Sequence, residues 1–487
     1  MKKNAIWVVS LLAGAVLAWA QPEPPVAPGR TTRDLSLDEA VQIAIRQNPA
    51  ILAAEQEIKR TRGVVLEVQA QALPHLTIGN EFTQEERNLL LAAAGIPAGA
   101  STGPAAAEQS PMTQSWDVTV TASQLIYSGG QVAAAIHIAK YTEDATIYSL
   151  RDVVDTTIAN VRSQFYAVLL DRAIITVQEE NINLLESQLK DQENRFEAGT
   201  VPRFNVLQAE VALANARPQL IQARNDYNVA ELNLARTLGV NKTELGSDMP
   251  PINPVGVLVT DEKPEALPQA IELARERRPF LKEQREQILI QVENIKVALA
   301  GYQPRLTADA GYEARNDLSS KSLDKAVYGW YFCFTGSWNV FDGGASYGQT
   351  KQAKAQLQEA KVNYDDAVRQ VDVEVEQAFD QVRESEDTIV SQQKAIEEAQ
   401  EALRLAQERL TAGAGVQLDV LSAQVGLTQA RTTLVQAQYN YNIAMAQFDR
   451  ATAANTRWQD LFHDPLVDRQ RGREGLANAP VTNARAK

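Results

Sequence analysis

The sequence is poor in the residues that build disulfide frameworks, metal centres and nucleic-acid surfaces. Cys333 is its one cysteine, which excludes an internal disulfide and a cysteine-based metal cluster. The three histidines, His75, His137 and His463, lie far apart in the sequence and lack the spacing of metal ligands. The net charge is −14 and no basic stripe is present, which argues against a nucleic-acid partner. No catalytic triad, phosphate-binding loop or carboxylate pair stands out, so we expect no cofactor and no enzymatic activity.

Long apolar runs are also missing. The run Ile6–Leu17 is shorter than the roughly 20 residues that a membrane-spanning helix needs, and no continuous apolar span follows it. Lys2 and Lys3 precede this run, and Ala18 and Ala20 provide the small residues of a cleavage site. This pattern indicates a signal peptide over residues 1–20 rather than a short membrane anchor. We expect an exported mature chain, which could enter a membrane only as strands.

Aromatic residues make up only 6% of the chain, and the abundance of Ala, Gln, Glu and Leu favours long helices over a thick globule. One helical hairpin pattern occurs twice, at an offset of 214 residues. Apolar residues recur at heptad spacing from Val161 to Phe196 and again from Val375 to Leu410. Each stretch ends at a short break around Gly199 or Gly413, after which a second helical pattern begins. The sequence therefore predicts two tandem structural repeats.

A shorter helix precedes each hairpin. Ser36 and Glu39 have the spacing of a capping box, so we expect a helix from Ser36 toward residue 72 with a break at Asn48-Pro49. Its copy begins at Leu267, 230 residues after Leu37. The larger offset requires an insertion in the first repeat, which we place in the Ala/Gly/Pro-rich stretch 89–111 and expect to be a loop.

Between the short helix and the hairpin, the apolar residues alternate with period two. Four such segments are predicted to be strands, near residues 75–88, 113–128, 304–316 and 328–342. Alternation over about ten residues with aromatic ends is the signature of strands in a membrane barrel. A soluble sheet with one buried face would give the same alternation, but no covering layer follows in the sequence. We expect a lipid-facing aromatic girdle formed by Trp116, Trp330, Phe332, Phe334 and Trp338.

The expected lengths define the architecture. A helix over residues 131–195 would reach roughly 100 Å, and the two shorter helices of a repeat, stacked end to end, would match it. Four strands cannot close a barrel, and open edges cannot face lipid because their N–H and C=O groups would lack partners. The chain must therefore associate with itself. Two copies would supply eight strands and three would supply twelve, and the strand count leaves both open.

The domain organisation follows from these patterns. We expect a signal peptide (1–20), a Pro-rich N-terminal segment (21–35), repeat 1 (36–240), a linker (241–264), repeat 2 (265–454) and a disordered tail (455–487).

From residue 37 to about residue 452 the sequence resembles the outer membrane efflux proteins, the TolC-like outer membrane factors. The resemblance rests on features that occur in duplicate and in order: the tips at 198–209 and 412–423, the entry helices that end in Pro, and the paired strands before Gly-Gly. It implies a membrane α+β fold: a homotrimer whose 12-stranded outer-membrane β-barrel, four strands per chain, continues as a long periplasmic α-helical coiled-coil barrel.

The resemblance also implies a function and partners. The chain would be the exit duct of a tripartite efflux or type I secretion system, lying in outer-membrane lipid and extending into the periplasm. A periplasmic adaptor would join it to an inner-membrane transporter of the RND, ABC or MFS class. The adaptor would dock at tip residues Ala198, Gly199, Thr200, Ala412 and Gly413.

The resemblance further implies a gate at the periplasmic entrance. Asp419 occupies the first of two aspartate positions of this gate, and Ser422 replaces the second. The tyrosine and arginine that restrain the gate in the family are replaced by Leu410 and Gly415. From the residues alone, Asp419 is equally suited to form a ring of carboxylates in an oligomer or to N-cap the returning helix. Gly199 and Gly413 are expected to adopt a left-handed turn conformation.

A different class of function stays open at this point. A periplasmic coiled-coil scaffold or stalk would have the same helices, but it would have no need of the four alternating segments. The sequence does not indicate the transported substrate or which adaptor and pump would be the partners.

Overall fold

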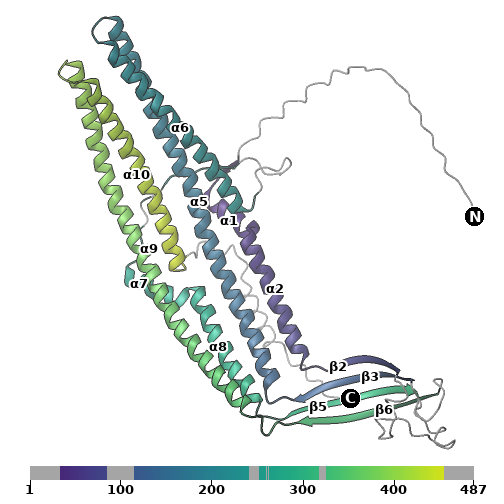
Figure 1. Cartoon of the computed structure of the whole chain (residues 1–487). Coiled ribbons are helices and arrows are strands. Elements are labelled where there is room, and N and C mark those ends of the chain that lie inside the picture. The colour runs from purple at the N-terminus through teal and green to yellow at the C-terminus, as the bar shows by residue number, and fades with distance from the viewer. Residues whose placement is uncertain are drawn as a thin grey trace, which may run out of the picture.

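The computed structural model describes residues 33–84, 114–240, 252–258, 260, 263–316 and 325–454. The expected signal peptide with Ala18 and Ala20, the loop 89–111 and the tail 455–487 lie outside the described residues. Long helices lie side by side in an extended bundle, and a four-stranded sheet lies at one end of it (Figure 1). Two helical hairpins reach the other end.

The first helical segment is divided as the sequence predicts. α1 (Leu37–Gln47) begins after Ser36, whose Oγ accepts the Glu39 N–H at 3.3 Å, while the Glu39 carboxylate accepts the Ser36 N–H at 3.4 Å. α2 (Pro49–Ala70) begins after Asn48, which caps it by accepting the Ala50 N–H at 2.8 Å. The predicted capping box and the predicted break are confirmed.

The two hairpins have nearly equal dimensions. The first pairs α5 (Gln131–Glu197) with α6 (Arg203–Leu238), and the second pairs α9 (Ala345–Thr411) with α10 (Gln417–Ala451). α5 and α9 each contain 67 residues, which corresponds to about 100 Å at 1.5 Å per residue. Both hairpins turn at a glycine in the left-handed conformation, Gly199 and Gly413, each with φ 72°. A residue with a Cβ would be strained at either position.

The short helices complete the columns beside the long ones. α6 ends beside the break between α1 and α2, where the Asn48 amide donates to the carbonyl of Thr237 at 2.7 Å. The second half contains the matching segments α7 (Leu267–Arg277) and α8 (Pro279–Ala300). In each half, two stacked segments therefore lie along one long helix, as expected from the lengths.

The sheet joins the two halves. Its strands β2 (His75–Gln84), β3 (Gln114–Tyr127), β5 (Arg305–Asn316) and β6 (Ala326–Ser337) are antiparallel in the order β2-β3-β5-β6. β3 comes from the first half and β5 from the second, so the central pair is the contact between halves. The last strand differs from the prediction of 328–342, because it begins two residues earlier and ends at Ser337.

A second, smaller sheet was not predicted. β1 (Arg33–Leu35) pairs in parallel with β4 (Ile252–Pro254), within segments expected to be irregular. Asn253 stabilises the pair by donating to Asp34 at 2.8 Å and accepting from Arg172 at 2.6 Å. The segment before α1 and the linker before α7 are thereby attached to α5.

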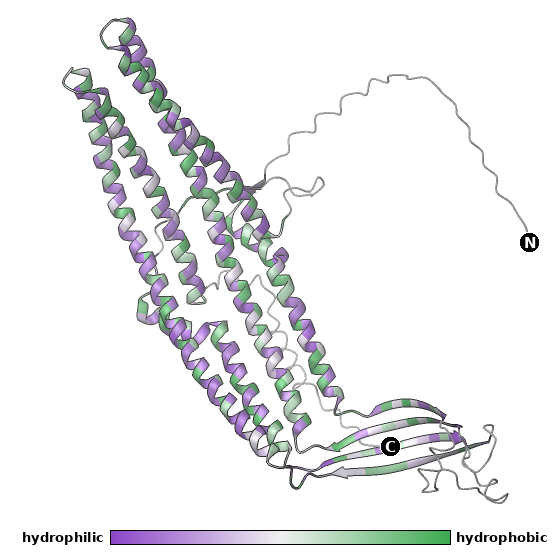
Figure 2. Ribbon diagram, in the orientation of Figure 1, coloured by the Kyte–Doolittle hydropathy of each residue, from purple (hydrophilic) through white to green (hydrophobic). Residues whose placement is uncertain are grey.

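Apolar cores follow the long helices. One cluster surrounds Phe165 on α5 and includes residues of α1, α2 and α6, and a second surrounds Val375 on α9 with residues of α7, α8 and α10. Figure 2 shows hydrophobic and hydrophilic residues interspersed along every helix. Among the described residues, no helix combines the length and the apolar character that crossing a bilayer would require.

Candidate functional site: a two-faced sheet and two helical tips

One face of the four-stranded sheet is apolar. Ile78, Val120, Tyr312 and Trp330 lie opposite one another in a single row across the four strands. Because paired residues point to the same side of a sheet, these side chains share one face. They are 73%, 37%, 50% and 81% exposed, although each is large and hydrophobic. Exposed apolar area on this scale indicates a face that contacts lipid or another protein.

The predicted girdle residues lie mainly on this face. Phe332 and Phe334 follow Trp330 at alternate positions of β6, and their rings meet edge to face at 4.7 Å. Trp116 of β3 is half-buried and lies opposite Phe82. Trp338 lies beyond the end of β6, where its indole N–H donates to the carbonyl of Tyr302 at 3.1 Å. Trp338 is thus at the junction between the sheet and the helices, not within a strand.

The opposite face of the sheet is polar. The neighbouring row contains Thr77, Thr121, Gly311 and Tyr331. The Tyr331 hydroxyl lies 2.7 Å from the Thr121 Oγ1, so the tyrosine reaches across β5 to β3. A Cβ at Gly311 would lie 2.5 Å from the Tyr331 ring, which explains the glycine at this position. Cys333, exposed, lies on the same polar side of β6.

Charged groups on the polar face are acidic in majority. Asp309 accepts a hydrogen bond from Ser123 at 2.6 Å, and Glu313 lies 3.5 Å from Arg315. Asp117 lies opposite Arg315 and next to Glu81 in the register. The sheet therefore presents water-compatible groups on one side and lipid-compatible groups on the other, the alternation that membrane barrels require.

The predicted docking residues lie at the tips, far from the sheet (Figure 1). At the first tip, Gly199 N–H donates to the Phe196 carbonyl at 2.9 Å and Thr200 N–H to the Arg195 carbonyl at 2.9 Å. At the second, Gly413 N–H donates to Leu410 at 3.2 Å. Ala198 and Ala412 are the matching residues at which α5 and α9 end. Both tips thus present a short exposed loop of small residues.

The predicted gate residues lie in the first turns of α10. Asp419 and Ser422 are both exposed. α10 begins at Gln417, so Asp419 is the third helical residue and not the N-cap that its position suggested. Its carboxylate still supports the helix start by accepting the Val416 N–H at 3.4 Å. Leu410 and Gly415, at the positions of the restraining residues of the family, are half-buried.

A row of amide side chains between α5 and α10 was not singled out from the sequence. Gln192 donates to Gln417 at 3.1 Å, and Gln424 donates to the side chain of Asn181 at 2.9 Å. Thr428 also donates to Asn181, at 3.2 Å. Isolated glutamines on a helix are typical of solvated surfaces, so only the pairing of the two hairpins reveals that these are buried.

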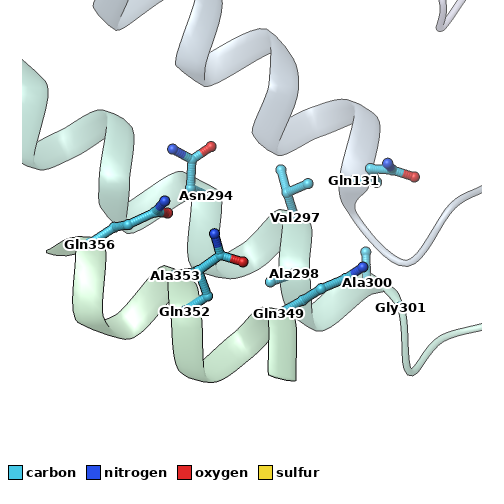
Figure 3. Close-up of a pocket in the computed structure, with 10 residues that line it drawn as sticks. All are labelled: Gln131, Asn294, Val297, Ala298, Ala300, Gly301, Gln349, Gln352, Ala353 and Gln356. Carbon is cyan, nitrogen blue, oxygen red and sulfur yellow. The ribbon is translucent and has the colours of Figure 1, made fainter. Parts of the chain in front are cut away.

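An open pocket of about 440 Å³ lies where α8, α9 and the start of α5 approach the sheet (Figure 3). Its polar lining consists of carboxamides, and its remaining lining residues are small or aliphatic. The ten residues are Gln131, Asn294, Val297, Ala298, Ala300, Gly301, Gln349, Gln352, Ala353 and Gln356. This lining offers hydrogen bonds but contains no acid, base or nucleophile.

Buried carboxyl groups lie midway along the helical bundle. Burial raises the pKa of Asp171 to about 6, and the nearby Asp226 adds to the effect. Burial also raises the pKa of Asp152, and it raises the pKa of Glu283, with a further contribution from Asp152. No group of three or more potential metal ligands occurs within the part of the chain that the structure describes.

The comparisons with known proteins agree with this geometry. The model of a family described as "Outer membrane efflux protein" matches residues 40–240 and 270–454. Protein CyaE of Bordetella pertussis is 23% identical over 312 residues, covering 64% of this chain and 60% of CyaE. Outer membrane protein TolC of Escherichia coli is 28% identical over 121 residues, covering 25% of this chain and 24% of TolC. The alignments thus span 60% or less of these two relatives.

Among solved structures, the CmeC outer membrane channel of Campylobacter jejuni superposes with a TM-score of 0.72 at 16% identity. The match covers 91% of this chain and 89% of CmeC. The open state of the MtrE outer membrane channel of Neisseria gonorrhoeae gives a TM-score of 0.67 at 18% identity, covering 85% of this chain and 88% of MtrE. At these identities the likeness shows a shared fold.

Proposed function

This chain belongs to the outer membrane efflux protein family, and on that premise we propose that it is the outer-membrane exit duct of a tripartite efflux or type I secretion system. The observation that carries the proposal is the sheet, with one apolar face, one polar face and two open edges, attached to helices of about 100 Å. Such a sheet suits the wall of a pore in lipid, and the helices are long enough to reach through the periplasm.

The two halves of the chain indicate how copies would join at the sheet. Inside the chain, the second strand of the first half, β3, pairs antiparallel with the first strand of the second half, β5. Among the described strands, β6 and β2 each have one unpaired edge. They are again a second strand and a first strand, so the same contact would form between β6 of one copy and β2 of the next. Repetition closes the edges that lipid cannot accept.

The helices support the same arrangement. Inside the chain, α5 covers one stripe of α10. The equivalent stripe of α6 is exposed, with Phe204 at 67%, Val211 at 57% and Ile221 at 68%. These residues lie near heptad spacing, the pattern of a surface that packs on another helix. We place α9 of the next copy there, and propose a homotrimer in which twelve strands form one barrel, as in the family.

The tips and the gate fit this assembly. We propose that a periplasmic adaptor docks beside Ala198, Gly199, Thr200, Ala412 and Gly413 and links the duct to an inner-membrane transporter of the RND, ABC or MFS class. Asp419 and Ser422 would surround the entrance. Three Asp419 carboxylates near one axis would attract cations. Asp419→Ala is expected to reduce cation selectivity in planar bilayers, and an unchanged selectivity would refute the carboxylate ring.

A matched pair of substitutions on β6 tests the proposed pore. Phe332→Lys places a charge on the apolar face, whereas Cys333→Lys places the same charge on the polar face one residue later. A lysine facing the middle of the lipid costs about 2–4 kcal/mol, and one facing the lumen does not. We expect Phe332→Lys to abolish heat-resistant oligomers in the outer-membrane fraction, while Cys333→Lys assembles and conducts. Equal behaviour of the two variants, or a soluble periplasmic monomer, would favour a periplasmic scaffold.

A further inference from the structure

The two hairpins of one chain meet along a polar seam. We define the amide seam as Gln178, Asn181, Gln188 and Gln192 of α5 together with Gln417, Gln424 and Thr428 of α10. Direct hydrogen bonds join Gln192 to Gln417 and Asn181 to both Gln424 and Thr428. Gln178 and Gln188 lie three residues before and seven after Asn181, which places them on the same stripe of α5. At the rim, Arg431 contacts Glu180 at 2.6 Å.

The closed seam is poorly satisfied. Buried polar atoms without a hydrogen-bond partner among the described residues are the Oε1 of Gln178, both side-chain polar atoms of Gln188, the Oε1 of Gln192, the Nε2 of Gln417 and the Oε1 of Gln424. A buried polar group left unpaired costs about 1–3 kcal/mol. Water entering between the hairpins would pair these atoms, so parting the seam recovers free energy that its closure costs.

Each hairpin, by contrast, is internally apolar. Leu185 of α5 packs with Leu213 of α6, and Leu403 of α9 packs with Val420 and Leu427 of α10. Separating the two helices of one hairpin would expose these leucines to water at about 25 cal/mol per Å² of apolar surface. The hairpins should therefore move as rigid units, and the plane of weakness lies between them.

The equivalent seam between copies has a different composition. At the 214-residue offset, Asn181, Gln188 and Gln192 correspond to Ala395, Ala402 and Ala406 of α9. On the partner helix, Leu421 and Thr428 correspond to Leu207 and Ala214 of α6, while Gln424 corresponds to Glu210. Alanine allows close approach of helices and leaves no polar atom unpaired. The two seams of a ring are thus equal in backbone geometry and unequal in cohesion.

We propose that the periplasmic end of the duct opens along the amide seam inside each chain, while the seams between copies stay packed. The inference rests on the proposed assembly of several copies around one pore. In the open state, the second hairpin of each chain stays with the first hairpin of the neighbouring copy and moves away from its own first hairpin.

The test begins with a substitution that weakens one seam. Arg431→Glu places two carboxylates together across the amide seam, and we expect it to raise the conductance for K⁺ and Cl⁻ in planar bilayers several-fold. The matched control is Arg217→Glu, the same substitution at the equivalent position of α6, where Arg217 lies 3.8 Å from Glu186 of its own hairpin. The control is expected to conduct like the unaltered chain. No rise with Arg431→Glu in oligomers of normal heat resistance would overturn the proposal.

Engineered disulfides then identify the seam that parts. In a Cys333→Ser background that carries Arg431→Glu, Asn181→Cys with Gln424→Cys closes the amide seam, and Ala395→Cys with Glu210→Cys closes the seam between copies. We expect the first disulfide to restore low conductance until a reductant is added. The second should give covalent oligomers whose conductance stays raised.

Two other outcomes are distinguishable. Low conductance with the second disulfide only would assign opening to the seam between copies and overturn the proposal. Absence of both covalent oligomers and conductance in every variant would instead remove the proposed duct, and this inference with it.

Discussion

The two halves of the chain have nearly the same backbone but different surroundings. α5 and α9 have equal length, yet α5 buries twice as many residues as α9. The reason is position, because α5 is packed by α2, α6, α8 and α10, whereas α9 is packed by α7, α8 and α10. The second half thus lacks on one side what the first half receives from it. The comparison indicates that α9 would obtain its missing neighbours, α2 and α6, from another copy.

The largest contrast in expected stability is at the ends of α6 and α10. Gly239 has φ 75°, and a Cβ there would lie 2.3 Å from the carbonyl oxygen of Gln47. The equivalent residue 214 positions later is Ala453, which adopts φ 51°. Gly239→Ala combines backbone strain with overpacking and should destabilise by about 3 kcal/mol. Ala453→Gly relieves strain and should stabilise by about 1 kcal/mol.

Thermal unfolding followed by circular dichroism checks this pair of substitutions. Opposite shifts of the midpoint are expected. A tolerated Gly239→Ala would mean that α6 does not abut the α1–α2 break as closely as the structure shows.

The second contrast lies at the break before the Pro that opens α2 and α8. Asn48 uses a neutral cap in the first half, while Arg278 forms an ion pair with Glu374 at 2.5 Å in the second. The Arg278 side chain is only 5% exposed, so Arg278→Ala leaves a charge in a buried site and should cost about 2–3 kcal/mol. Arg450, 3.5 Å from Glu374, limits the loss.

Asn48→Ala removes a cap and should cost about 1 kcal/mol. Unfolding midpoints of the two variants in one detergent compare them directly. A larger loss from Asn48→Ala would show that the neutral cap, and not the ion pair, is the stronger of the two connections.

The smallest expected effect concerns pH. Asp171 has a pKa raised to about 6 from 3.8, and its equivalent in the second half is the neutral Ser385. A carboxyl whose folded-state pKa is raised disfavours folding above pH 6, and this penalty disappears as the pH falls toward 4. Asp171→Ser should therefore raise stability at neutral pH and flatten the profile between pH 4 and 6. Because Asp171 is only half-buried, the change is expected to be modest, and an unaltered profile would contradict the assignment.

Local signals in the sequence were sufficient for most of the helices and strands. Ser36 with Glu39 predicts the start of α1, Asn48-Pro49 predicts its end, and Gly199 and Gly413 predict the turns, because each effect acts over a few residues. The strand alternation predicts the two faces of the sheet for the same reason, although β6 ends earlier than the aromatic pattern suggested.

Features that depend on distant residues were not predictable. β1 and β4 are three residues long and pair residues 219 positions apart, so neither has a recognisable period. Asp419 was placed one turn position too early, because Gln417 already belongs to α10. The amides of Gln192 and Gln424 have the composition of a solvated face, and only the docking of two hairpins buries them.

The central claim is that the contact between the halves of one chain recurs between copies. A single-particle electron microscopy structure of the purified oligomer in lipid nanodiscs tests it most directly. We predict three copies around one pore, with β6 of each copy hydrogen-bonded antiparallel to β2 of the next and α9 packed on the stripe of α6 that contains Val211. A particle with unpaired β2 and β6 edges, or with β6 paired to β2 of the same chain, would contradict the account.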